Sequence, residues 1–422
     1  MRYARKWPVA AGLALLLALA SWLARPELVE TAPEETSIEP TPALIAKGEY
    51  LARAGNCIAC HTAPGQAPYA GGRAIATPFG AVYSTNLTPD PETGLGNWSA
   101  ADFWRAMHYG KSRDGRRLYP AFPYTSYTHV TREDADAIFA FLRSLEPVPS
   151  PRIEADIGFP YNTQLAQIVW RALYFRPGGL EPDPARSPEW NRGAYLVEGL
   201  GHCSVCHTRR TPLGGEDASA RYVGGSIPML GWDAPPLAPT GPLSDEEAAE
   251  MAEVLKAGTS AHGVASGPMA EVVFHSLQYL DDADIAAIVE YVRALPPPPP
   301  RTRGSGPVVA SGRAEQLVTL GASLYREHCA DCHGADGKGE PYVYPALAGN
   351  PLVTSPSPAN LLATVRLGGY APSTAAHPRP YGMPPYAQQL SAEEIAAVAS
   401  YVRRAWGNGA PAVSPTLVRE RR

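Results

Sequence analysis

The sequence predicts an all-α fold built from three consecutive small domains. Three observations support this fold class. A C-x-x-C-H segment occurs three times, at intervals of 146 and 126 residues. Each copy follows a short helical segment that contains a glycine and an aromatic residue, and each precedes an amphipathic helix with acidic residues in its first turn. A unit that recurs in this order along one chain indicates repeated helical domains.

The composition is that of a globular protein with long loops. The chain has 422 residues, which is too long for one small core, and its 45 prolines and 39 glycines gather between the periodic segments. Its formal net charge is −5 at pH 7 and its pI is about 6.1. No basic cluster interleaved with aromatic residues follows the first few positions, so we expect no nucleic-acid partner.

Residues 1–24 are typical of a signal peptide or a membrane anchor. Three cations precede an apolar run from Val9 to Ala24, and a small-x-small site at residues 18–20 would permit cleavage. The 18 residues from Trp7 to Ala24 are also just long enough to span a bilayer if they are retained. In both cases the rest of the chain leaves the cytoplasm. No later segment is apolar enough to span, so further membrane contact is expected to be peripheral or through a partner.

All six cysteines belong to the three C-x-x-C-H segments, "CIACH", "CSVCH" and "CADCH". An exported protein with an even cysteine count often forms disulfides, but these segments leave no cysteine over. They are the signature of c-type haem attachment, in which two thiols add to the porphyrin vinyl groups and the adjacent histidine binds iron. A redox-active C-x-x-C pair does not need the histidine, and zinc would need a fourth ligand. We therefore expect three covalently bound haem c groups.

Each haem requires two attachment cysteines and one proximal histidine. The expected attachment residues are Cys57, Cys60, Cys203, Cys206, Cys329 and Cys332, and the expected iron ligands are His61, His207 and His333. A ligating histidine usually donates its second ring nitrogen to an acceptor such as a backbone carbonyl. We expect that carbonyl in the proline-containing loop after each segment, at Pro78, Pro228 and Pro345.

Closing helices and proline-rich segments mark the ends of the domains. The closing helices begin at Thr131, Asp281 and Ser391, whose side chains can cap the first turn. The predicted parts are domains over residues 41–150, 192–296 and 311–408, a helical connector over 151–191, a stiff proline-rich linker over 297–310 and a C-terminal tail over 409–422. The connector is amphipathic, and we expect it to pack against a haem domain or a partner subunit.

Two methionines occupy matching positions and are candidates for the second axial ligand of iron. A methionine on this side raises the haem potential. Met383 lies in "GMPPYAQQLS" just before a closing helix, and Met269 lies in "GPMAEVV" in the second domain. Each follows a predicted helix that ends in glycine, at Gly368 and Gly258. We expect Met269 and Met383 to ligate the second and third haems.

The first domain has Phe122 where the other two have methionine. The preceding helix, "SAADFWRAMHYG", carries Met107, which is the sixth ligand that we expect for the first haem. The neighbouring His108 is an alternative, and so is His129, seven residues beyond Phe122. In the remaining alternative Met107 is a core residue, both histidines are surface residues and the first haem is five-coordinate.

With these motifs the chain resembles the triheme cytochrome c subunits of bacterial membrane-bound dehydrogenases, such as the alcohol and gluconate dehydrogenases. The resemblance covers nearly all of the chain after the signal and includes "GGRAIATPFGAVYSTNLTPDPETGLGNWS", "RGAYLVEGLGHCSVCHT" and "YGMPPYAQQLS". It implies three consecutive class I-type cytochrome c domains on the periplasmic face of the bacterial cytoplasmic membrane. The departure is Phe122, where the family often has methionine.

The resemblance also implies a function. The chain would take electrons from a catalytic dehydrogenase subunit, a quinoprotein, flavoprotein or molybdoprotein, and pass them through three haems to ubiquinone or a terminal oxidase. Its acidic residues fall mostly on helix starts and exposed faces, so the sequence offers no convincing general base. We therefore expect a non-catalytic electron-transfer subunit. The alternative is a haem enzyme whose open first haem acts on a small oxidant or a sulfur compound.

Overall fold

Helices form most of the regular secondary structure in this computed structural model, which describes residues 21, 37–298 and 309–420. Nearly all of the predicted signal or anchor over 1–24, and most of the predicted linker over 297–310, lie outside the described residues. No helix in the described ranges has the length and apolar character needed to cross a membrane. The chain divides into two compact units: the first contains residues up to 184 with 195–205 and 210–216, and the second contains the others.

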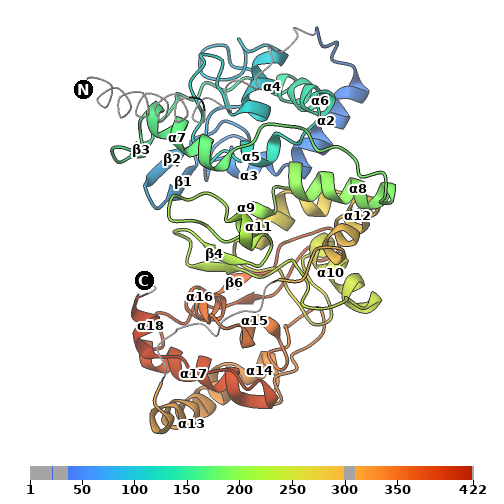
Figure 1. The fold of residues 1–422 in the computed structure, drawn as a ribbon. Helices are drawn as coiled ribbons and strands as arrows, with labels where there is room; N and C mark the ends of the chain where they lie inside the picture. The colour runs from blue at the N-terminus through green and yellow to red at the C-terminus, as the bar shows by residue number, and fades with distance from the viewer. Residues whose placement is uncertain (1–20, 22–36, 299–308, 421–422) are drawn as a thin grey trace, which may run out of the picture. The chain divides into compact units, whose positions relative to one another are not determined.

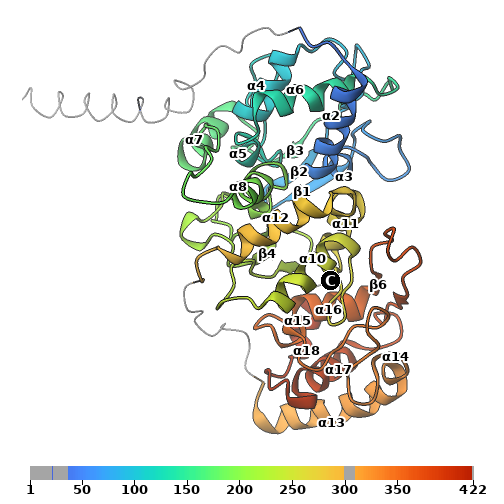
Figure 2. The ribbon, with the colours of Figure 1, turned by 90° about the vertical axis from the view of Figure 1, so that its right-hand side faces the viewer.

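The first unit is built on a crossed pair of helices. Helix α2 (Pro42–Ala54) packs against the closing helix α6 (Arg132–Arg143), and both views show the two together (Figures 1 and 2). The helices touch at Gly48, where a β-carbon would lie 1.9 Å from the carbonyl oxygen of Ala137. Only glycine allows the backbones to approach this closely.

The second unit repeats this crossing twice. Helix α8 (Pro188–Ala194) packs on α12 (Asp282–Arg293), and α13 (Ser311–His328) packs on α17 (Ala392–Arg404), as Figure 2 shows for the latter pair. The crossing glycines are Gly193, with a β-carbon 1.9 Å from Ala287 O, and Gly321, with a β-carbon 2.0 Å from Ala397 O. The glycine of each predicted first helix is therefore the contact point with the closing helix.

The closing helices begin where the sequence predicts. The side chains of Thr131, Asp281 and Ser391 each accept a hydrogen bond from the backbone N–H three residues later. This bond satisfies one of the N–H groups that have no partner within the helix. The predicted N-caps are confirmed.

A further helix precedes each candidate ligand loop. These helices are α4 (Ala100–Tyr109), α10 (Asp245–Ala257) and α16 (Ala359–Leu367). They end at Gly110, Gly258 and Gly368, which have φ angles of 59°, 82° and 66°. Glycine adopts this left-handed backbone without a steric penalty, so the predicted ends of these helices are confirmed.

Short strands accompany the helices, so the fold is mostly helical but not purely all-α. Strands β1 (Ala74–Thr77), β2 (Gly80–Tyr83) and β3 (Asp156–Ile157) form an antiparallel sheet in the first unit. The second unit contains the antiparallel pairs β4 (Gly225–Ile227) with β5 (Trp232–Ala234) and β6 (Gly369–Tyr370) with β7 (Gly382–Met383). Strands of two to four residues are too short to leave an alternating pattern in the sequence.

The connector contains helix α7 (Gln164–Tyr174), which packs on the first predicted domain. The Arg171 guanidinium is fully buried and donates to the carbonyl oxygen of Tyr109 at 2.6 Å. The remaining helical segments are α5 (Tyr124–Tyr127), a π-helical turn over Tyr195–Leu200, α11 (Pro268–His275), α15 (Pro351–Thr354), α18 (Pro415–Glu420) and short 3₁₀ turns over Ala218–Ala220, Leu277–Tyr279 and Ala405–Gly407.

A hydrophobic core surrounds the helix pair of the third predicted domain. It includes Leu317 and Tyr325 of α13, Leu362 and Val365 of α16, and Val398 of α17. Residues from the predicted tail over 409–422 also reach this core, through Val413 and Val418.

Candidate haem sites

Each C-x-x-C-H segment forms a short helical turn. These turns are α3 (Cys57–Cys60), α9 (Ser204–His207) and α14 (Ala330–His333), and none of the six cysteines forms a disulfide. Burial raises the pKa of the Cys57 thiol to about 12 and that of Cys329 to about 11. A redox-active C-x-x-C pair has a lowered thiol pKa, so these shifts argue against that alternative in the first and third segments.

Each candidate proximal histidine is held by a backbone carbonyl. The Nδ1 atom lies 2.7 Å from Thr85 O in His61, 2.7 Å from Pro235 O in His207 and 3.0 Å from Pro345 O in His333. Burial lowers the pKa of all three rings, although the carbonyl contact opposes this shift. A neutral ring that donates from Nδ1 presents the Nε2 lone pair, which is the form that binds iron.

The structure confirms that Pro345 supplies the carbonyl that binds His333. The predictions of Pro78 and Pro228 for the other two sites are wrong. Pro78 lies in the turn between β1 and β2, and Pro228 directly follows β4. The carbonyls that bind histidine come from the far ends of these hairpins instead: Thr85 lies two residues after β2 and Pro235 follows β5 directly. In the third site an antiparallel bridge between Glu340 and Tyr344 precedes Pro345 in the same way.

A glycine holds the backbone of each candidate histidine through a hydrogen bond to the histidine carbonyl. The three glycines donate an N–H to the histidine carbonyl and have positive φ; they are Gly71 to His61 (2.8 Å, 78°), Gly224 to His207 (2.9 Å, 79°) and Gly339 to His333 (2.9 Å, 61°). Each also lies against the strand end that supplies the carbonyl. At Gly339, for example, a β-carbon would lie 2.2 Å from Tyr344 O. Glycine is therefore required both for the backbone angle and for the close approach.

Two tyrosines that the sequence did not single out tie the candidate ligand loops to the attachment segments. Tyr127 Oη donates to Gly55 O at 3.1 Å in the first site. Tyr386 Oη donates to His328 O, directly before Cys329, at 2.7 Å in the third. Tyr127 follows Phe122 by five residues and Tyr386 follows Met383 by three, so the loop that contains each of these positions is held close to its C-x-x-C-H segment.

Met383 and Met269 both lie within short defined elements. Met383 is in β7, is half-buried and packs against the core that contains Val365. Met269 is the second residue of α11 and is also half-buried. It follows Gly267, where a β-carbon would lie 2.6 Å from the Trp232 ring. Met383 therefore packs on the core, and Met269 lies directly after a backbone position that is fixed by packing.

The candidates in the first site have different surroundings. Met107 is on α4 and only 4% exposed. His108 is also buried, and its ring stacks on Trp104 with the ring centres 4.3 Å apart. The Nδ1 atom of His129 lies 3.1 Å from Gly178 O. Phe122 is half-buried, with its ring centre 5.3 Å from that of Tyr127.

His202 is a second contact that the sequence did not indicate. It directly precedes Cys203, and its ring bonds to the carbonyl of Gly55 and lies edge-on to Tyr127 with the ring centres 5.6 Å apart. Burial lowers the pKa of His202, which keeps the ring neutral. All three residues belong to the first unit.

No group of three or more His, Cys, Asp and Glu side chains is placed to hold a bare metal ion in the part of the chain that the structure describes.

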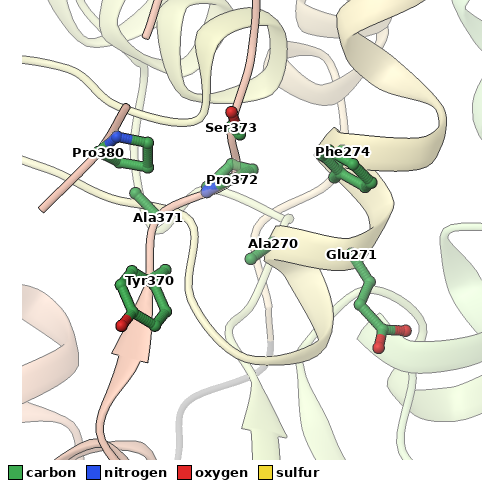
Figure 3. A pocket seen from close by; sticks show the side chains of 8 residues that line it. All are labelled: Ala270, Glu271, Phe274, Tyr370, Ala371, Pro372, Ser373 and Pro380. Atoms are coloured by element: carbon green, nitrogen blue, oxygen red, sulfur yellow. The ribbon is translucent and has the colours of Figure 1, made fainter. Parts of the chain in front are cut away.

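An open apolar pocket of the second unit is lined by residues of α11, by Tyr370 at the end of β6 and by the segment that connects β6 to β7 (Figure 3). Its volume is about 360 Å³, and it is lined by Ala270, Glu271 and Phe274 of α11 and by Pro380 and residues 370–373. Met269 directly precedes Ala270, and the other wall belongs to the segment that connects β6 to β7, which carries Met383. No pattern in the sequence indicates this pocket, because its walls come from segments about 100 residues apart.

Comparison with known proteins places these features in context. A family model for cytochrome c matches residues 45–146 and 318–406. The chain is 38% identical over 402 residues to the cytochrome c subunit of a quinone alcohol dehydrogenase from Gluconacetobacter polyoxogenes, covering 89% of this chain and 84% of the relative.

Two further relatives are similar to this chain over a comparable share of their length. A gluconate 2-dehydrogenase cytochrome c subunit from Pantoea cypripedii is 38% identical over 88% of this chain and 87% of its own length. A fructose dehydrogenase cytochrome subunit from Gluconobacter japonicus is 37% identical over 90% of this chain and 84% of its own length. These alignments extend across the middle of the chain, where the family model does not match.

Proposed function

The chain belongs to the family of dehydrogenase cytochrome c subunits, and from this premise we propose that it is the triheme electron-transfer subunit of a periplasmic dehydrogenase complex. As a cytochrome c it carries covalently bound haem c. The observation that supports three haems is the threefold arrangement of C-x-x-C-H turn, glycine and carbonyl-bound histidine around residues 57–61, 203–207 and 329–333.

The thiols and imidazoles of the three sites are the groups that haem c requires for its attachment and for iron ligation. In each site two thiols outside disulfides can form the thioether bonds, and a neutral imidazole has its Nδ1 side occupied by a carbonyl. Haem c supplies a one-electron Fe(III)/Fe(II) couple when it is bound. The chain then has to fix the imidazole plane, exclude water and keep the surroundings the same in both oxidation states. Crossed helices and glycine-fixed loops suit this task because they resist rearrangement.

We assign Met269 and Met383 as the sixth ligands in the second and third sites. Both are half-buried thioethers, Met269 in α11 and Met383 in β7, and glycines packed against aromatic rings lie just before α11 and within β7. Thioether ligation raises the haem potential, which suits a carrier that receives electrons from a substrate-oxidising partner.

We assign Met107 as the sixth ligand in the first site. The ring of His108 is stacked on Trp104, and the ring of His129 is bound to the connector through Gly178. Met107 is apolar and buried on the helix that ends directly before the loop containing Phe122. Val365, which occupies the corresponding helix position in the third site, lies in the same core as Met383. A buried methionine at this helix position is therefore well placed to take over the role of the missing one.

The electron donor that we propose is a catalytic dehydrogenase subunit. The relatives are named as subunits of alcohol, gluconate and fructose dehydrogenases. This chain would receive electrons from a quinoprotein, flavoprotein or molybdoprotein of that kind on the periplasmic face of the cytoplasmic membrane. The N-terminal apolar sequence over 1–24 supports export to that face.

The electron acceptor that we propose is ubiquinone or a terminal oxidase, and the pocket of Figure 3 supports the quinone. Its walls are apolar, and the segments that form them carry Met269 and Met383. An apolar pocket of this size admits an aromatic headgroup. Ala270→Trp should fill it and slow quinone reduction while substrate still reduces the haems. Ala376→Trp, on the exposed part of the same segment, should have no effect, and equal rates in both variants would favour an oxidase as acceptor.

Purification of the chain from membranes tests the proposed function directly. We expect three haems per chain, a co-purifying dehydrogenase subunit as the largest partner, and haem reduction when that enzyme's substrate is added. The competing function is a haem enzyme with an open first site, which the replacement of methionine by Phe122 favours. Stoichiometric carbon monoxide binding by one reduced haem would support that function, whereas three low-spin haems would exclude it.

A further inference from the structure

Helix α7 of the first unit has its polar and apolar faces reversed. Gln167 and the fully buried Arg171 lie on the face that packs against the protein. The opposite face carries Leu165, Val169 and Leu173, which are 66%, 38% and 40% exposed. A surface helix of a globular protein normally directs its apolar stripe toward the core. Leu165, Val169 and Leu173 form an exposed apolar row, the outer stripe.

Polar contacts hold the helix in this orientation. Arg171 donates to Tyr109 O at 2.6 Å, and its guanidinium lies 4.7 Å from the centre of the Phe175 ring. Gln167 Nε2 donates to Tyr161 O at 3.1 Å. Rotation that buried the outer stripe would break both hydrogen bonds and expose a stacked cation. The outer stripe is therefore a stable feature of the surface.

Two other exposed apolar side chains belong to segments next to α7 in the sequence or bonded to it. Phe159, five residues before α7, is 83% exposed. Leu213 is also exposed, and its carbonyl accepts a hydrogen bond from Trp170 of α7 at 3.0 Å. Figures 1 and 2 show α7 at the edge of its unit in both views. An apolar surface of this kind on a protein usually marks a contact with a membrane or a partner.

The charge beside α7 favours an anionic membrane. The loop over residues 111–117, "KSRDGRR", carries four cations and one carboxylate, whereas the whole chain has a net charge of −5. Two of these cations lie beside carboxylates, because Asp114 pairs with Arg116 and Asp102 lies 3.7 Å from Arg113, and the loop itself has three more cations than carboxylates. The side chain of Gln164 bonds to both the N–H and the carbonyl of Arg117, which fixes this loop at the first turn of α7.

The chain outside the described residues gives a second argument for a membrane. The apolar run that ends at Ala24 is followed by only twelve residues before the described part of the first unit begins at Ser37. Twelve residues span at most about 40 Å. A retained run would keep the first unit close to the bilayer, where an eleven-residue helix is too short to cross but long enough to lie in the interface.

We propose that the outer stripe of α7, together with Phe159, is a membrane-docking surface that inserts into the headgroup region of an anionic bilayer, with the basic loop over 111–117 against the lipid phosphates. This inference rests on the proposed location at the periplasmic face of the membrane. It places the contact on the first unit and on the connector.

Vesicle flotation of the full haem-containing chain tests the proposal. We expect the protein to float with vesicles of phosphatidylcholine and phosphatidylglycerol and to float less with phosphatidylcholine alone. Leu165→Glu combined with Leu173→Glu should lower the bound fraction by about tenfold or more, because each change removes the burial of one leucine. The matched control is Leu367→Glu with Leu320→Glu, which are 60% and 39% exposed on helices of the second unit and should float like the wild type.

Hydrogen exchange decides the outcome if residues 9–24 are retained and hold every variant on the vesicles. Vesicles should then protect residues 159–174 in the wild type and in the control but not in the α7 variant. Equal protection of the two variants, or equal flotation of the two variants when residues 9–24 have been cleaved, would overturn the proposal. Loss of co-purification with the dehydrogenase in the α7 variant, with lipid binding intact, would show a protein interface instead. Haem content and substrate-driven haem reduction test the electron-transfer function separately and should not change.

Discussion

A β-carbon on Gly321 would lie 2.0 Å from the carbonyl oxygen of Ala397, so α13 and α17 can cross as they do only with glycine at this position. The same relationship joins Gly48 to Ala137 and Gly193 to Ala287. Because this contact sets the approach of the first and closing helices, it also sets the space that each proposed haem domain encloses.

Gly321→Ala should destabilise the third domain. The added carbon must push the two helices apart, and overpacking of this kind costs about 1–3 kcal/mol. The better helix propensity of alanine offsets at most about 1 kcal/mol of this loss. Denaturant unfolding of the full haem-containing chain measures the change. Gly312→Ala is the control on the same helix, because a β-carbon there has no neighbour within 4 Å, and it should leave stability unchanged or slightly higher.

Gly339→Ala should disturb the third haem site more than Gly349→Ala, although both glycines have positive φ, of 61° and 70°. Alanine at either position adopts the left-handed backbone at a cost of about 1–2 kcal/mol. At position 339 it also meets Tyr344 O at 2.2 Å, beside the carbonyl that holds His333, whereas position 349 has open space. We expect a changed spin state or midpoint potential of one haem in Gly339→Ala alone. Identical spectra and potentials in both variants would contradict this role for Gly339.

The features that the sequence predicted correctly are local ones. The N-caps Thr131, Asp281 and Ser391 each depend on a side chain and a backbone N–H three residues away, so they can be predicted from short segments. The C-x-x-C-H turns are equally local.

The missed features depend on contacts between distant residues. The carbonyls of Thr85 and Pro235 lie 24 and 28 residues after the histidines that they hold, and backbone carbonyls carry no residue-type signal. Helix α7 was predicted as an amphipathic helix, but its periodicity does not say which face is buried. The contact of Arg171 with Tyr109, 62 residues earlier, decides that, and no short segment contains it.

Asp90 should contribute to stability at neutral pH and lose that contribution in acid. Its Oδ1 atom accepts hydrogen bonds from Thr93 Oγ1 and Thr93 N, both at 2.7 Å, and from Glu92 N at 3.1 Å. The hydrogen bond from the Thr93 hydroxyl is the main reason why the pKa of Asp90 lies below its ordinary value of 3.8. The stabilisation is therefore fully present above this value and disappears as the pH falls through the lower pKa of the folded state.

Urea unfolding across the acid range measures the effect. Asp90→Asn should be less stable than the wild type at neutral pH, and the difference should shrink in acid as the wild-type carboxylate becomes protonated. Glu92→Gln changes an exposed carboxylate in the same loop and should track the wild type throughout. A stability difference between Asp90→Asn and the wild type that does not vary with pH would show that the carboxylate charge is not involved.

Met107→Leu should convert one haem of the reduced protein to a high-spin form that binds carbon monoxide. Leucine keeps most of the buried volume on α4 but has no sulfur to donate, so ligation is lost while packing is largely retained. Optical and electron paramagnetic resonance spectra measure the spin state. Met269→Leu and Met383→Leu should each give the same change in a different haem, which calibrates the signal. His108→Phe and His129→Gln should leave all three haems low-spin.

A second change separates ligation by Met107 from a general disturbance of the first site. Phe122→Met places a thioether at the position that Met269 and Met383 occupy in the other domains. Combined with Met107→Leu, it should restore three low-spin haems, because the loop is already tied to the attachment segment through Tyr127 and Gly55. An unchanged spectrum in Met107→Leu would exclude Met107 as the ligand. If the wild type already binds carbon monoxide at one haem and Phe122→Met alone abolishes that binding, the first haem is naturally open.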